Sequence, residues 1–108
     1  MKIPSWLKIG GRKYAVIFPY VFKDSSQVLR GLCDQSGQKI MVSDSDAHNG
    51  KVHPQSIEQT FMHEVIHAID NVYCCGKLAQ CENGEDIVDQ LAEGIIQVFR
   101  DNKLTFIP

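Results

Sequence analysis

The chain has 108 residues, and its 44% hydrophobic and 22% charged content is ordinary for a globular protein, so we expect one domain over residues 1–108. A net charge of −2 argues against nucleic acid as the main partner, because nucleic-acid-binding proteins present a basic surface. The sequence has no apolar run of 18 residues and no secretion signal within residues 1–11, which predicts a cytoplasmic protein with no membrane partner.

Four β-strands are predicted in the first half of the chain, as two hairpins that form a short antiparallel β-meander. Gly10-Gly11 separates the first two strands, and a turn around Ser36-Gly37 separates the last two. Residues 44–52 are polar and are expected to form a loop. The predicted strands cover residues 6–9, 13–18, 28–34 and 38–43.

A helix is predicted after this loop. Pro54 suits a helix entrance, Ser56 and Gln59 have the form of a capping box, and Gly76 is a plausible stop. One broad apolar arc of the helix is expected to be buried, and a narrow polar stripe opposite it is expected to face outward. The arc contains Phe61, Val65, Ala68, Ile69 and Val72, and the polar stripe contains Thr60, His63, His67, Asp70 and Cys74.

A last helix is predicted over residues 85–102. Asn83 could cap it, and the carboxylates of Glu85 and Asp86 suit the positive end of its dipole. Strands followed by helices indicate an α+β fold. The expected core stripe of this helix contains Val88, Leu91, Ala92, Ile95, Val98 and Phe99.

The four cysteines are expected to be reduced thiols, because nothing in the sequence indicates secretion. A cysteine metal site is the less favoured alternative, since there is no CxxC pair and adjacent cysteines seldom bind one ion. A disulfide within residues 74–81 is a further alternative. The cysteines are Cys33, Cys74, Cys75 and Cys81.

Residues 63–67 read H-E-x-x-H inside the first predicted helix. Helical residues four apart lie about 6 Å from each other on one face, so His63 and His67 can bind one metal ion. Zinc suits such a pair and leaves a position for water, from which Glu64 could accept a proton as general base. The alternative is a helix whose histidine and glutamate side chains only face solvent.

Two histidines leave a zinc site one protein ligand short of the usual three. On a helical wheel, Glu85 and Asp89 share an edge of the last helix's core stripe and face the neighbouring helix, whereas Asp86 and Glu93 point to solvent. Glu82 precedes the cap, so Glu85 is the predicted third ligand. Asp89 is predicted to accept the second ring N–H of a ligating histidine. Alternatively, both acidic residues only stabilise the helix dipole.

The two motifs together resemble the gluzincin branch of zinc metallopeptidases, which carries H-E-x-x-H on one helix and E-x-x-x-D on the next, here residues 85–89. More narrowly, the whole layout is similar to small metallopeptidase-like proteins encoded by bacteriophages and prophages. The phage repressor-cleaving metallopeptidases are a more distant similarity. The resemblance covers nearly the whole chain, although only the two metal motifs are specific.

This resemblance implies a minimal zincin-like fold and a bacterial host cell as the location. It implies Zn²⁺ held by His63, His67 and Glu85, with Glu64 as general base. The chain departs from full-length gluzincins, because its length leaves no room for the further lobe that helps to form their substrate cleft. The oxyanion-stabilising residue also stays open among Tyr14, Tyr20, Tyr73, His48 and His53.

Two functions are consistent with these patterns. The first is a zinc-dependent hydrolase, a metallopeptidase that cleaves a specific protein or peptide and has weak activity on generic peptides. Its substrate could add as a strand to a sheet edge at Gln38–Ser43. The alternative is a zinc-stabilised protein, weak or inactive in catalysis, that binds a host or viral partner. An intact Glu64 favours the enzyme, since metal binding alone does not need that carboxylate.

Overall fold

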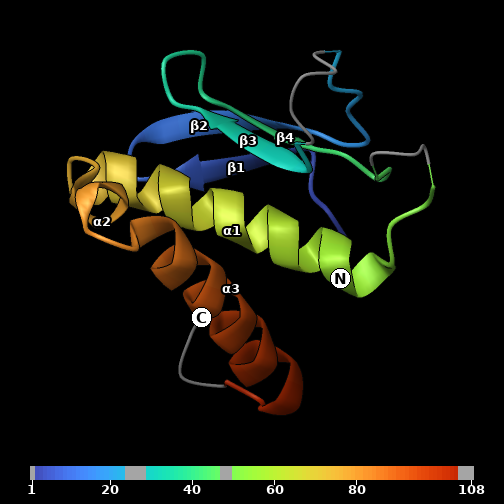
Figure 1. Ribbon diagram of the computed structural model, residues 1–108. Coiled ribbons are helices and arrows are strands. Elements are labelled where there is room, and N and C mark those ends of the chain that lie inside the picture. Colours follow the sequence, from blue (N-terminus) through green and yellow to red (C-terminus); the bar gives the residue numbers. More distant parts are fainter. Residues whose placement is uncertain (1, 24–28, 47–49, 105–108) are drawn as a thin grey trace.

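The computed structural model describes residues 2–23, 29–46 and 50–104, and it has the predicted α+β architecture (Figure 1). A sheet at the N-terminal end is followed by the two predicted long helices. A short helix that was not predicted lies between them in the chain. The last long helix begins and ends within one residue of its predicted bounds. The elements are β1 (Trp6–Ile9), β2 (Arg12–Ile17), β3 (Gly31–Asp34), β4 (Lys39–Val42), α1 (Pro54–Tyr73), α2 (Lys77–Gln80) and α3 (Gly84–Asp101).

The sheet is mixed, with strand order β1-β2-β4-β3, so the predicted antiparallel meander is wrong. The two hairpins form as expected, but β2 and β4 pair in parallel, with Val16 opposite Ile40. Burial explains the order. Residues 40–42 of β4 are buried on both faces, which suits a central strand, whereas Leu32 in β3 is 43% exposed at the edge. Gln38–Ser43 is therefore no sheet edge, and β3 takes that place.

Helix α1 lies between the sheet and α3 (Figure 1). One of its sides packs on the sheet, and another packs on α3. The polar stripe predicted to face outward is therefore largely covered: His63 and Asp70 are buried, whereas Ile69 is 42% and Tyr73 66% exposed. The core under the sheet contains Ile9, Tyr14, Val16, Ile40, Val42, Phe61 and Ala68, and the smaller core between the helices contains Ile66, Val88 and Ala92.

The predicted core stripe of α3 is only partly correct. Helix α3 packs along α1 through Val88, Ala92 and Ile96, which are spaced four residues apart and buried. Leu91 is 45% and Phe99 is 56% exposed, because the other described elements pack against only one side of α3.

The ends of α1 differ from the predicted caps at one point. His53 is the N-cap, and its Nδ1 accepts the backbone N–H of Gln55 at 3.1 Å. Pro54 then starts the helix, two residues before the predicted capping residue Ser56, because its fixed φ already suits the first helical position. At the other end the chain leaves the helix through the left-handed residues Cys75 and Gly76, as the position of that glycine predicted.

Candidate metal centre

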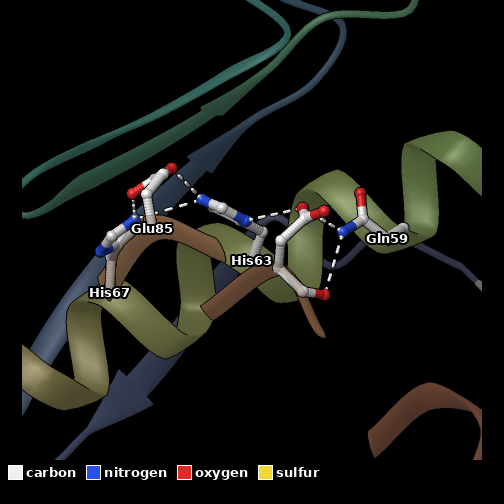
Figure 2. A network of polar contacts seen from close by, with 5 residues as sticks. Gln59, His63, His67 and Glu85 are labelled. Carbon is white, nitrogen blue, oxygen red and sulfur yellow. Dashed lines mark hydrogen bonds and ion pairs between the residues drawn. The ribbon is translucent and has the colours of Figure 1, made fainter. Parts of the chain in front are cut away.

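His63, His67 and Glu85 converge between α1 and the start of α3 (Figure 2). Nε2 of His63 lies 2.6 Å from one carboxylate oxygen of Glu85, and Nε2 of His67 lies 3.0 Å from the other. The two Nε2 atoms are 3.2 Å apart. The two histidines are one helical turn apart, and α3 brings its first turn over them. The structure thus brings together the three side chains that the sequence singled out as ligands.

These spacings suit a small tetrahedral ion. Zinc bonds to nitrogen and oxygen are about 2.0–2.1 Å long, so donor atoms around one ion are separated by about 3.3 Å. Nε2 of His67 is 3.2 Å from Nε2 of His63 and 3.0 Å from Oε2 of Glu85, and both separations are near that value. The contact between Nε2 of His63 and Oε1 of Glu85, at 2.6 Å, is shorter. Two imidazoles and one carboxylate are also a donor set that zinc accepts in catalytic sites.

The hydrogen-bond chemistry of His63 also calls for a cation. Its Nδ1 lies 3.1 Å from Oδ1 of Asp89, which can only accept, so the contact favours hydrogen on Nδ1. Nε2 of His63 then presents a lone pair to the carboxylate of Glu85 and to His67. Added protons or a metal ion must supply the positive charge between these acceptors. The donor set can therefore hold either a metal ion or added protons.

Asp89 itself is held by Gln59, a residue that was predicted only as part of a capping box and not as part of this centre. Nε2 of Gln59 lies 2.6 Å from Oδ1 of Asp89 and 3.4 Å from its backbone oxygen (Figure 2). The chain Gln59–Asp89–His63 runs from α1 to α3 and back to α1. Its effect is to fix the orientation of the His63 ring. Only the contact, not the sequence, identifies Gln59, because an amide on a helix has many other uses.

Glu64 lies beside the three donor side chains, on the side of α1 that faces β3. It is buried, and burial raises the pKa of its carboxyl to about 7. The neighbouring His63 lowers this pKa, Glu85 raises it, and a backbone hydrogen bond from Cys33 lowers it. A carboxyl group with a pKa near neutrality can both take up and release a proton at physiological pH.

Gly31 in the edge strand makes this position of Glu64 possible. A Cβ atom at Gly31 would lie 2.6 Å from Cγ2 of Thr60 and 3.0 Å from Oε2 of Glu64. Only glycine therefore lets β3 approach α1 so closely. The sequence analysis missed this residue, although a glycine inside a strand is a known signal of close backbone approach.

A cleft of about 380 Å³ opens between β3 and the helices, beside Glu64. Both the predicted base and one predicted ligand line it, so the cleft reaches the donor group from the side of β3. The lining residues are Leu29, Arg30, Gly31, Gln59, Thr60, His63, Glu64 and Asp89.

The other acidic candidates lie apart from the centre. Glu82, Asp86 and Glu93 are exposed, and none belongs to the group of potential ligands found within the described residues. The four cysteines carry free thiols, and they too are outside that group. The choice of Glu85 by helical position agrees with this arrangement.

Among the described residues, none of the tyrosine and histidine candidates for oxyanion stabilisation lines this cleft. Tyr14 is fully buried in the core, Tyr20 contacts Phe22, and His53 caps α1. Tyr73 is exposed beside the β1–β2 turn, where its hydroxyl would lie 3.6 Å from a Cβ at residue 10. His48 lies outside the described residues.

No protein-family model, curated protein or solved structure matches this chain. Among the described helices, none combines the length and the apolar character that are needed to cross a lipid bilayer.

Proposed function

We propose that the protein is a zinc-dependent hydrolase, a metallopeptidase that cleaves a specific protein or peptide. The observation that carries this proposal is the position of Glu64. Its carboxyl group is buried between the donor side chains and the cleft, and it is not needed to complete the donor set. Burying an ionisable group costs free energy, so such a group in a cleft is a candidate for chemistry.

In this proposal His63, His67 and Glu85 hold zinc, and Asp89 and Gln59 hold the His63 ring in place. When bound, zinc polarises a substrate carbonyl and makes water easier to deprotonate. The carboxylate of Glu64 accepts the proton that water gives up as it attacks. The same carboxyl then delivers this proton to the nitrogen of the leaving amine.

The edge strand β3 supports an extended peptide as the substrate. The cleft lies beside this strand, and most of the residues that line it have polar side chains. An extended segment can hydrogen-bond to a sheet edge, whereas a small molecule needs a pocket that surrounds most of its surface. The substrate strand is thus assigned to the side of Gly31, in place of Gln38–Ser43.

The same cleft supports specificity for one partner. Among the described residues that line it, none is a tyrosine or histidine candidate for oxyanion stabilisation. Rate then depends on binding energy from contacts outside the cleft, which a folded protein partner supplies and a short generic peptide does not. We expect weak cleavage of generic peptides.

Glu64→Gln tests this function. The substitution keeps the size of the side chain and removes the base, so zinc content should persist while cleavage falls by two orders of magnitude or more. Wild type and variant are incubated with bacterial lysate, and new protein termini are mapped. Glu93→Gln, an exposed change on α3, is the matched control and should cleave like the wild type. Retained zinc without any Glu64-dependent termini would favour the zinc-stabilised binding protein instead.

A further inference from the structure

Asp70 is buried at the end of α1 that carries the metal centre, and its contacts do not involve the donor atoms. Only 2% of its surface is exposed. Oδ1 accepts the backbone N–H of Leu78 and Oδ2 accepts that of Ala79, both at 3.0 Å. Its backbone oxygen accepts the N–H groups of Cys74 and Gly76, at 2.8 and 3.1 Å. Every acceptor of Asp70 is thus directed at the connection between α1 and α3.

The segment that Asp70 holds is packed against the first residue of α3. Gly84 is buried, and a Cβ atom there would overlap the carbonyl oxygen of Leu78 and lie 2.9 Å from that of Ala79. Its backbone N–H also donates to the oxygen of Cys81 at 2.9 Å. Helix α2 and the start of α3 therefore form one packed unit.

Each end of this link lies close in sequence to a predicted ligand. Asp70 follows His67 by three residues on α1, and Glu85 follows Gly84 directly on α3. The link from Asp70 through α2 to Gly84 therefore helps to set the separation of His67 from Glu85, together with the packing of Val88 and Ala92 against Ile66 of α1. A carboxylate that accepts two backbone N–H groups makes stronger bonds than a neutral side chain, which suits a fixed link.

We propose that Asp70 is a positioning residue for the metal centre, and that it acts through the placement of Glu85. This inference rests on the zinc site of the proposed function and not on its hydrolytic activity. Removing Asp70 should leave the two histidines in place on α1 while the start of α3 loses its fixed position. The expected effect is weaker zinc binding of the size found for residues that orient ligands, about 10–100-fold.

The first test is zinc affinity, measured by competition with a chromophoric chelator. Asp70→Ala should weaken binding about 10–100-fold, and Asp70→Asn should weaken it less, because the amide keeps one acceptor oxygen. Gly84→Ala is a second variant that disturbs the same link without touching Asp70, and it should also weaken binding. Ile40→Val, in the core of the sheet, is the control for stability: it should lower Tm and leave zinc affinity unchanged.

A double-mutant cycle separates positioning from general stabilisation. If Asp70 acts through Glu85, Asp70→Asn should have almost no effect on zinc affinity in a Glu85→Ala background, measured at correspondingly higher zinc concentrations. Equal fold-losses in both backgrounds would overturn the inference, as would a lower Tm with unchanged zinc affinity. A wild-type protein that binds no zinc would overturn it together with the zinc site. A protein that binds zinc without cleaving any substrate would reject only the hydrolase, and the cycle would still decide the role of Asp70.

Discussion

Asp89 contacts His63 at 3.1 Å through Nδ1, the ring nitrogen that points away from the other donor atoms. Gln59 holds the same carboxylate oxygen at 2.6 Å. Two residues from different helices therefore fix the orientation of the His63 ring that is predicted to bind metal through Nε2. Asp89 contacts the ring directly, and Gln59 holds Asp89. Asp89 is therefore not one of the predicted ligands, and substituting it should weaken zinc binding less than substituting a ligand.

Asp89→Asn should weaken zinc binding about 10–100-fold, because the amide can present its NH₂ group to Nδ1 and favour the wrong ring tautomer. Glu85→Ala should weaken it more, since a ligand is lost. Isothermal titration of both variants with zinc gives the ranking. Glu93→Gln serves as the control on the same helix. A stronger loss for Glu93→Gln than for Glu85→Ala would refute the assignment of ligands.

Gly31→Ala should destabilise the protein by about 1–3 kcal/mol, because the added methyl group overlaps the side chains of Thr60 and Glu64. Urea unfolding measures the change. Gly94→Ala is the matched control: a Cβ at that helical position meets nothing within 4 Å, so alanine should stabilise by about 0.5–1 kcal/mol. Wild-type stability of Gly31→Ala would mean that β3 and α1 are further apart than the structure has them.

Metal-free Glu64→Gln should be more stable than the metal-free wild type at pH 8. Burial raises the pKa of Glu64 in the folded protein from 4.5 to about 7, so between these values the folded chain keeps a proton that the unfolded chain has lost. Wild-type stability therefore falls as pH rises through this window. Glutamine does not titrate and avoids the loss, which is up to roughly 3 kcal/mol above pH 7.

Urea unfolding in the presence of a chelator at pH 4.5 and pH 8 measures this effect. The difference between Glu64→Gln and wild type should grow from the lower to the higher pH. Glu93→Gln should show no such growth, because that side chain is exposed. An identical difference at both pH values would mean that Glu64 is not buried as an ionisable group.

The proximity of His63 and His67 was predictable because their spacing is local. His63 and His67 share a helix, and helical geometry alone puts them on one face. Glu85 required one more step, the placement of its helix edge toward a neighbouring helix. Its carboxylate does reach both histidines, although the side chain is 69% exposed. Gln59 and Gly31 could not be assigned in this way, because their roles exist only once α3 and β3 have packed against α1.

The strand order was not predictable from hairpin signals. Turns determine which neighbours along the chain pair, and both hairpins formed, but the pairing of Val16 with Ile40 joins residues from separate hairpins. The continuous apolar run at residues 40–42 was the available signal, since a central strand is buried on both faces. The start of α1 is a smaller example. The helix begins at Pro54 and not after the predicted capping residue Ser56.

The most direct test of the zinc site is elemental analysis of protein purified without added metal, for the wild type, Glu64→Gln and Glu85→Ala. The account predicts about one zinc per chain in the wild type and in Glu64→Gln, and much less in Glu85→Ala. Zinc far below one per chain in the wild type, and not restored by reconstitution, would contradict it.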